Sequence, residues 1–292
     1  VYNLSILFTK GLITVSKKFL RFPGGVHKAV TLSYDDGIVS DLKLLEIINK
    51  KGIKCTFNIN TGQLGSGKPW KHYRDRFSRE ETIEIYSGSG HEVAVHTLTH
   101  PFLEQLTPAE IAHEVLRDRE NLEQMFKTVV RGMAYPFGTY SDDVVSVLKS
   151  CGIAYARTVE SKHSFGIETD WLRLKPTCHH NDPMLDKLCD EFLAPQPDYK
   201  TLPRVFYLWG HSYEFDDRNN WEVLEKFCDK MGGRSDVWYA TNIEIYDYVQ
   251  AYNSLLFSAD GTVCTNLSSY DVYFEKAMKL YCVKSGETLT ID

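Results

Sequence analysis

Strand-like and helix-like stretches alternate along most of this chain, and the alternation limits the folds open to it. Between residues 29 and 255, short segments rich in β-branched and aromatic residues alternate with segments whose apolar residues recur at helical spacing. One helix start is marked clearly, because Thr107, Pro108 and Glu110 have the order of a capping box. Repeated strand–helix units imply a parallel sheet covered by helices. About seven or eight units favour a closed β/α barrel over an open sheet.

The chain divides into three expected parts. Residues 1–28 are expected to be an N-terminal extension packing on the barrel, and residues 29–256 the barrel itself. After residue 256 the pattern changes to short strand-like pieces joined by polar turns, with Gly261 and Gly286 between them. Residues 257–292 are therefore expected to form a small antiparallel β appendage.

The net charge and the cysteine pattern limit which partners and which cellular location are expected for this chain. A net charge of −6 argues against nucleic acid as the main partner, since such proteins carry a basic footprint. No apolar run approaches the roughly 20 residues of a membrane span. The seven cysteines are scattered and lack CxxC spacing, which is typical of reduced thiols and predicts a cytoplasmic location. An export signal removed before Val1 would leave the same sequence.

Residues capable of chemistry gather where four expected strands end. These are SYDDG (33–37), HTLTH (96–100), YPFG (135–138) and LWGH (208–211). Barrel enzymes place their sites at the carboxyl ends of the strands, so these segments are expected to share one mouth. Within HTLTH, His96 and His100 are four residues apart, a spacing that puts both imidazoles on one side of a helical turn. Two histidines and a carboxylate would leave a zinc-like ion open to water and substrate.

Two other histidine groups are weaker candidates. HEVAVH (91–96) places its histidines five apart in a strand-like segment, which argues against the zinc-protease pattern and leaves His91 as a structural or rim residue. Cys178, His179 and His180 are adjacent in an extended segment, where neighbouring side chains face opposite ways. A joint metal site is therefore not expected there, although one of the two histidines could line the cleft. Four aromatic residues lie near the expected strand ends, and each could either pack in the core or stack on a substrate. They are Tyr34, Tyr135, Trp171 and Trp209.

In chain order, SYDDG, HTLTH, AYPFG and LWGH resemble the signature motifs of the polysaccharide deacetylase family. This family is carbohydrate esterase family four, also called the NodB-homology domain, and the resemblance covers about residues 28 to 255. It implies an α/β fold, a distorted (β/α)7-type barrel, in agreement with the strand count. It also implies a metal-dependent hydrolase that removes acetyl groups from an N- or O-acetylated oligo- or polysaccharide. The implied cofactor is a divalent metal, Zn²⁺, with Co²⁺ or Ni²⁺ as alternatives.

The resemblance also implies a role for each motif residue. Asp35 would be the general base and His211 the general acid, while Asp36, His96 and His100 would hold the metal. The backbone N–H of Phe137 would face the oxyanion.

Two positions depart from the family pattern. Ala134 stands where the family has an arginine that tethers the base, and Arg173 or Lys175 could substitute for it. Asp170 and Trp171 fit the family's Asp-Trp pair, which supports the catalytic histidine.

Three alternatives stay open from the residues. The same fold could hydrolyse another C–N bond, such as that of a cyclic amide. Two histidines and a carboxylate also hold Fe(II) in oxygenases, but there the carboxylate commonly lies close in sequence to the first histidine, and Asp36 lies about 60 residues upstream. A non-catalytic carbohydrate-binding relative is disfavoured, because the base, the ligands and the acid are all retained.

Overall fold

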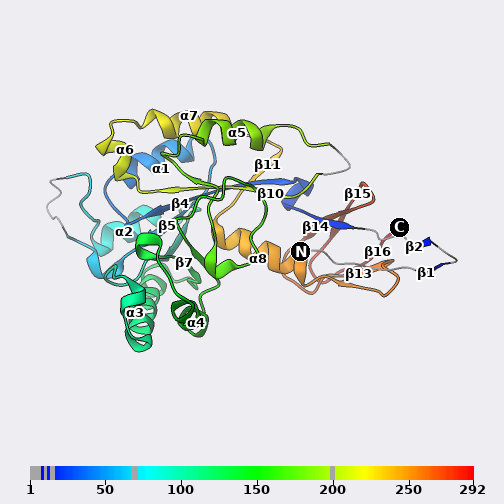
Figure 1. The fold of residues 1–292 in the computed structure, drawn as a ribbon, viewed down its shortest axis with the longest axis horizontal. Coiled ribbons are helices and arrows are strands. Elements are labelled where there is room, and N and C mark those ends of the chain that lie inside the picture. Colours follow the sequence, from blue (N-terminus) through cyan, green and yellow to red (C-terminus); the bar gives the residue numbers. More distant parts are fainter. Residues whose placement is uncertain (1–7, 10–11, 14–16, 67–71, 198–200) are drawn as a thin grey trace.

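Eight parallel strands form the main sheet of the protein (Figure 1). The computed structural model describes residues 8–9, 12–13, 17–66, 72–197 and 201–292. Seven strands follow the order β8–β7–β6–β5–β4–β10–β9, and β11 pairs with β4 beside them. Their bounds are β4 (Lys28–Asp35), β5 (Cys55–Ile59), β6 (Glu92–Val95), β7 (Gly132–Ala134), β8 (Tyr155–Arg157), β9 (Cys178–His179), β10 (Arg204–Gly210) and β11 (Val237–Tyr239).

The sheet is built around β4, which is buried along its whole length. One edge of β4 pairs with β10, and the other pairs first with β11 and then with β5. Residues 174–179 link the two ends of the sheet, because Leu174 bridges Arg157 of β8 while Cys178 and His179 pair with β10. The sheet therefore curls into a distorted barrel, and the expected α/β barrel architecture is confirmed.

Helices cover the barrel on both sides (Figure 1). Their starts follow the sequence signals, since Thr107 and Glu110 form a reciprocal capping box before the long helix α3. The same device begins α8 at Thr241 and Glu244. In Figure 1, α1, α5, α6 and α7 lie on one side of the sheet and α3 and α4 on the other. The α-helices are α1 (Asp41–Asn49), α2 (Arg79–Tyr86), α3 (Pro108–Phe126), α4 (Asp142–Ser150), α5 (Leu185–Leu193), α6 (Tyr213–Asp217), α7 (Glu222–Met231) and α8 (Asn242–Asn253).

Short 3₁₀ turns lie in several of the connections, and one, η5, lies in the long segment between β8 and β9, which has no α-helix. The turns are η1 (Pro23–Gly25), η2 (Thr61–Gln63), η3 (Leu103–Gln105), η4 (Pro136–Gly138) and η5 (Trp171–Arg173).

The C-terminal residues form small antiparallel sheets, as expected. One sheet has the order β12–β13–β16, and the other has the order β15–β14–β3. The second sheet recruits β3 from the N-terminal region, and a separate hairpin pairs β1 with β2. The bounds are β1 (Phe8–Thr9), β2 (Leu12–Ile13), β3 (Lys18–Arg21), β12 (Leu256–Phe257), β13 (Val263–Thr265), β14 (Val272–Lys276), β15 (Lys279–Val283) and β16 (Thr288–Thr290).

Strand β3 joins the appendage to the barrel. It pairs antiparallel with β14, and Tyr252 and Tyr248 of α8 donate hydrogen bonds to the carbonyls of Lys18 and Arg21 at 3.1 and 2.9 Å. The expected domain boundaries after residues 28 and 256 stay predictions, and residues 1–7, 10–11 and 14–16 of the expected extension lie outside the described residues.

Two apolar clusters hold these layers together. The larger lies between the sheet and its covering helices, and the smaller joins α8 to the appendage. Each fully buried large apolar side chain contributes about 1.5–3 kcal/mol to folding. Within the described ranges, no helix has both the length and the apolar character that crossing a membrane requires.

Candidate active site

The four motifs meet at the carboxyl ends of their strands, and the first three contain residues with a strained backbone. Nine described non-glycine residues have a positive φ, and four of them belong to the motifs: Asp36, Thr97, His100 and Phe137. Such conformations persist only where the surroundings impose them, and they concentrate at functional sites.

Asp36, His96 and His100 form a group that could hold a metal. One ligand atom from each lies within 4.8 Å of the others. The Nδ1 of His96 donates to the Ala134 carbonyl at 2.9 Å, whereas its buried Nε2 has no hydrogen-bond partner in the described part of the chain. Burial lowers the pKa of His96 to about 4, so the imidazole is neutral near pH 7. A neutral histidine whose second nitrogen is fixed by a carbonyl is the usual form of a metal ligand, so these residues fit a divalent cation.

The backbone conformation that brings His96 and His100 together differs from the helical turn expected from the sequence. Their rings lie 4.8 Å apart, but the segment between them is not a helical turn. Thr97 and His100 adopt left-handed backbone conformations, with φ of 65° and 63°. The expected proximity is therefore produced by two unusual residues rather than by helical spacing.

Asp35 is buried and held by an arginine that the sequence reasoning missed. The Nη2 of Arg157 lies 2.5 Å from both carboxylate oxygens, and Asn58 Nδ2 donates to Oδ1 at 2.8 Å. Burial alone would raise the pKa of Asp35, but Arg157, His96 and His211 outweigh it and lower that pKa to about 2. The carboxylate therefore stays ionised.

Arg157 on β8 stands directly opposite Ala134 on β7 in the parallel pairing. The arginine that contacts Asp35 therefore lies on β8, next to the β7 position where the family pattern has it. Its guanidinium carbon lies 4.5 Å from the centre of the buried Trp209 ring, a cation–π contact that fixes it from another side. A signal was present in the sequence, because Arg157 lies near the carboxyl end of an expected strand.

The predicted substitutes for this arginine lie elsewhere. Arg173 pairs with Asp170 and Asp142, and Lys175 pairs with Glu160. Asp170 is therefore engaged by Arg173, three residues along the chain, and the structure gives it no contact with His211. Among the described residues, the contacts expected of Arg173 and Asp170 are instead made by Arg157 on Asp35 and by Glu214 on His211.

The carboxylate behind His211 comes from Glu214 of α6. The two side chains are joined at 2.9 Å through His211 Nδ1, while His211 Nε2 lies 3.8 Å from Asp35 Oδ2. Burial lowers the pKa of His211, but the bond to Glu214 and the charges of Asp35 and Asp36 outweigh it, so the pKa is raised above its ordinary value. The imidazolium form is thereby favoured.

Glu214 is also the centre of a second histidine group. Its Oε2 lies 3.2 Å from His179 Nε2, 3.1 Å from His180 Nε2 and 2.8 Å from Asn181 Nδ2. The expectation that His179 and His180 face opposite ways is wrong, because β9 ends at His179 and the chain turns before His180. His179 Nδ1 accepts the Asn181 backbone N–H, so its Nε2 carries the hydrogen that faces Glu214. His180 Nε2 is buried without a hydrogen-bond partner among the described residues, and His179, His180 and Glu214 form a second group that could hold a metal ion.

The predicted strand-end aromatics are mostly packing residues. Tyr34 and Tyr135 are buried, and Tyr135 donates to the Leu172 carbonyl at 2.8 Å, so neither can stack on a substrate. Trp209 packs on Arg157, and Trp171 packs edge-on against Tyr246 of α8. The exposed aromatic surface is instead a pair formed by Phe102 and Phe137.

The Phe102 and Phe137 side chains are 39% and 49% exposed, and their rings stack with centres 3.8 Å apart. The Phe137 ring also meets His100 edge-on, with centres 4.5 Å apart. An exposed apolar surface therefore lies directly beside the metal group.

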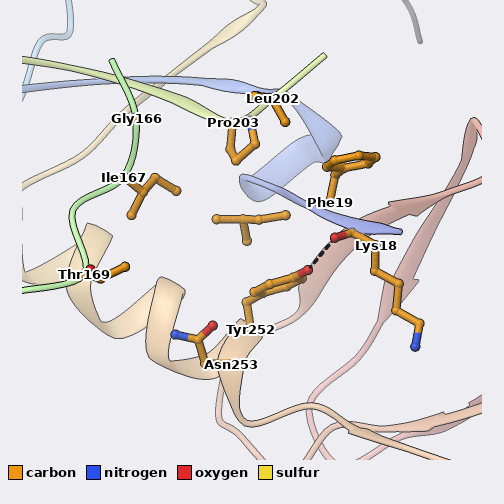
Figure 2. Close-up of a pocket in the computed structure, with 10 residues that line it drawn as sticks. Lys18, Phe19, Gly166, Ile167, Thr169, Leu202, Pro203, Tyr252 and Asn253 are labelled. Carbon is orange, nitrogen blue, oxygen red and sulfur yellow. Dashed lines mark hydrogen bonds between the residues drawn. The ribbon is translucent and has the colours of Figure 1, made fainter. Parts of the chain in front are cut away.

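A cavity of about 220 Å³ lies apart from this site (Figure 2). Ile167, Pro203 and Tyr252 surround it, and the hydrogen bond from Tyr252 to the Lys18 carbonyl runs along its border. It lies beside the beginning of β10, whereas His211 follows the end of that strand. The motif residues therefore do not line this cavity.

Comparison with known proteins agrees with this geometry. Residues 23–156 match the family model described as polysaccharide deacetylase, a range that contains Asp35, Asp36, His96, His100 and Phe137. Over these residues the chain is similar to the polysaccharide deacetylase family. Arg157 and His211 lie beyond the matched range.

Two curated relatives are each 28% identical to this chain. One is the chitooligosaccharide deacetylase of Bradyrhizobium sp. (strain ANU 289), aligned over 130 residues, which are 44% of this chain and 54% of the relative. The other is the poly-beta-1,6-N-acetyl-D-glucosamine N-deacetylase of Staphylococcus aureus (strain MSSA476), aligned over 160 residues, 50% of this chain and 52% of the relative. The chain thus spans about half the length of these relatives.

A solved structure shares the fold. A candidate polysaccharide deacetylase from Mycobacterium smegmatis superposes with a TM-score of 0.55 at 18% identity, covering 80% of this chain and 94% of that one.

Proposed function

We propose that this protein is a metal-dependent carbohydrate deacetylase. The observation that carries the proposal is the position of Asp35, whose Oδ2 lies 3.9 Å from His96 Nε2 and 3.8 Å from His211 Nε2. A buried, ionised carboxylate thus stands between a metal-ligand group and a histidine with a raised pKa. One relative is named a chitooligosaccharide deacetylase and the other a poly-beta-1,6-N-acetyl-D-glucosamine N-deacetylase, which supports an N-acetylated oligo- or polysaccharide as substrate.

Asp36, His96 and His100 would hold the divalent cation, for which we propose Zn²⁺, with Co²⁺ and Ni²⁺ as alternatives. When bound, such an ion would supply a Lewis acid and lower the pKa of a water from 15.7 towards about 7.

Asp35 would accept the proton of the attacking water through Oδ2. Its Oδ1 accepts from Asn58, and Arg157 contacts both oxygens, so Oδ2 is the oxygen that faces His96 and His211. The backbone N–H of Phe137 would donate to the oxyanion of the tetrahedral intermediate, an effect worth about 3–4 kcal/mol for a well-placed donor.

His211 would protonate the leaving nitrogen. An amine leaves poorly until it is protonated, and a raised pKa keeps His211 in the imidazolium form. Glu214 holds Nδ1 at 2.9 Å, which leaves Nε2–H directed to the side of Asp35, where the substrate would bind.

The exposed rings of Phe102 and Phe137 would contact the apolar face of a sugar next to the acetyl group. Aromatic side chains bury large areas on such surfaces. This pair therefore supports a saccharide as the substrate.

The proposal is tested by acetate release from chitooligosaccharides and β-1,6-linked N-acetylglucosamine oligomers, with a cyclic amide in the same panel. We expect acetate release that stops on chelation, returns with Zn²⁺ or Co²⁺, and is lost in Asp35→Asn. Asp142→Asn, a highly exposed carboxylate on α4, is the matched control and should retain activity. Full activity after chelation or in Asp35→Asn would contradict the mechanism, and turnover of the cyclic amide alone would change the substrate class. Oxygen consumption without acetate would indicate an oxygenase.

A further inference from the structure

Arg76 contacts the proposed metal group, and the reaction described above does not use it. Its Nη2 donates to Asp36 Oδ1 at 3.1 Å. Both side chains are largely shielded, at 14% and 15% exposure. The Nε of Arg76 is buried without a hydrogen-bond partner among the described residues, so the bond to Asp36 is the contact that offsets the burial of the guanidinium.

The backbone of Arg76 is fixed by the strand end that carries Asp36. Arg76 forms an antiparallel bridge with Ile38, and the Val39 and Ser40 amides donate to the carbonyls of Asp75 and Tyr73 at 2.9 and 3.2 Å. The segment from residue 73 to residue 76 therefore runs alongside residues 38–40.

The same segment is fixed to α6 on its other side. Tyr73 and Arg74 both donate to the carboxylate of Asp217, and the Arg74 guanidinium carbon lies 4.3 Å from the centre of the Tyr213 ring. Arg76 is thus held between the element that carries Asp36 and the helix that carries Glu214.

This contact restricts how Asp36 can bind a cation. A carboxylate can bind through one oxygen or through both, and Arg76 occupies Oδ1. A guanidinium has only donors, so Arg76 can hold this oxygen but cannot itself bind a cation. The left-handed backbone of Asp36, with φ of 84°, further fixes the direction of its side chain.

We propose that Arg76 is a positioning residue that holds Asp36 as a ligand through one oxygen only, Oδ2, and so keeps coordination positions open for water and substrate. The inference rests on the proposed metal site. It would give each neighbouring aspartate its own arginine, Arg157 for Asp35 and Arg76 for Asp36.

The direct test is a crystal structure of the chain loaded with Co²⁺. We expect one Asp36 oxygen on the ion and Arg76 still hydrogen-bonded to the other. An ion bound by both oxygens, with Arg76 displaced, would overturn the proposal.

A second test measures Co²⁺ affinity on the metal-free protein by calorimetry. Arg76→Lys keeps the charge but loses the planar guanidinium, and we expect the dissociation constant to rise about tenfold, as for other residues that orient metal ligands. Arg74→Lys alters the same segment without touching Asp36 and should leave the affinity unchanged. Unchanged or tighter binding in Arg76→Lys, or an equal loss in Arg74→Lys, would overturn the proposal. A wild-type chain that binds no Co²⁺ would instead refute the metal site itself.

Discussion

Arg157 lies 2.5 Å from both carboxylate oxygens of Asp35, and it does so from the strand position directly opposite Ala134. The pair is buried on both sides. A charge-assisted contact of this kind fixes the direction of a base and keeps it ionised.

Loss of this arginine should therefore damage both activity and stability. Arg157→Ala leaves the Asp35 charge buried without its partner, which should lower the free energy of unfolding by about 3–5 kcal/mol. A base displaced by about 1 Å should cost on the order of 100-fold in kcat/KM. Urea unfolding and acetate-release kinetics would measure the two effects. Arg173→Ala, which removes an arginine that does not contact Asp35, should change neither by a comparable amount.

Moving the arginine back should restore part of the activity. Ala134 and Arg157 are paired across β7 and β8, so Ala134→Arg in the Arg157→Ala background places a guanidinium beside the same carboxylate. We expect a kcat/KM above that of Arg157→Ala. A double variant no better than the single one would show that position 157 is required for a reason other than its charge.

The pH dependence should depend on Glu214. Because the pKa of His211 is raised, the imidazolium needed for catalysis is present below that pKa and is lost as the pH rises through it. Glu214→Gln removes the largest contribution that raises this pKa, so the alkaline fall in kcat/KM should move to lower pH. Asp35, with a pKa of about 2, should not limit the rate at mildly acidic pH.

Profiles of kcat/KM against pH for the wild type and Glu214→Gln would check this shift, with the exposed Glu222→Gln as a control. An alkaline limb at the same pH in all three would exclude His211 as the titrating acid.

Metal binding should stabilise the fold. At a free Co²⁺ concentration 1,000 times its dissociation constant, the gain is about 4 kcal/mol. His100→Ala should lose most of this gain, whereas His91→Ala, at the opposite end of β6, should keep it. Thermal unfolding with and without Co²⁺ measures the difference, and an equal shift in His100→Ala would contradict the ligand assignment.

The Phe102 ring should contribute to substrate affinity. Phe102→Ala removes one of two stacked, exposed rings, and a loss of about 1 kcal/mol would raise KM about fivefold with little change in kcat. Val129→Ala, another exposed apolar residue, is the control. A fall in kcat at constant KM would show that Phe102 acts on Phe137 or His100 rather than on the sugar.

Local signals made much of the architecture predictable. Hydrophobic period, the Thr107 capping box and the strand-end motifs are contained in short stretches, and the structure follows them closely. The proximity of the four motifs was also predictable, because the parallel strands of one barrel end at the same face.

Long-range register was not predictable in the same way. No local signal makes positions 134 and 157 neighbours, so Arg157 could not be paired with Asp35 from spacing. Chain order pointed to Asp170 as the support for His211, whereas the turn into α6 brings Glu214 there instead. The burial of Tyr34 and Tyr135 likewise depends on side chains from distant strands.

The pairing of β3 with β14 has a consequence for biosynthesis. Arg21 and Tyr273 stand opposite each other in this pair, so β3 lacks its partner until residues 272–276 have left the ribosome. Strand edges that await a partner are sites of association between chains. The barrel strands can assemble earlier, so β3 must wait for a partner that is made after the whole barrel.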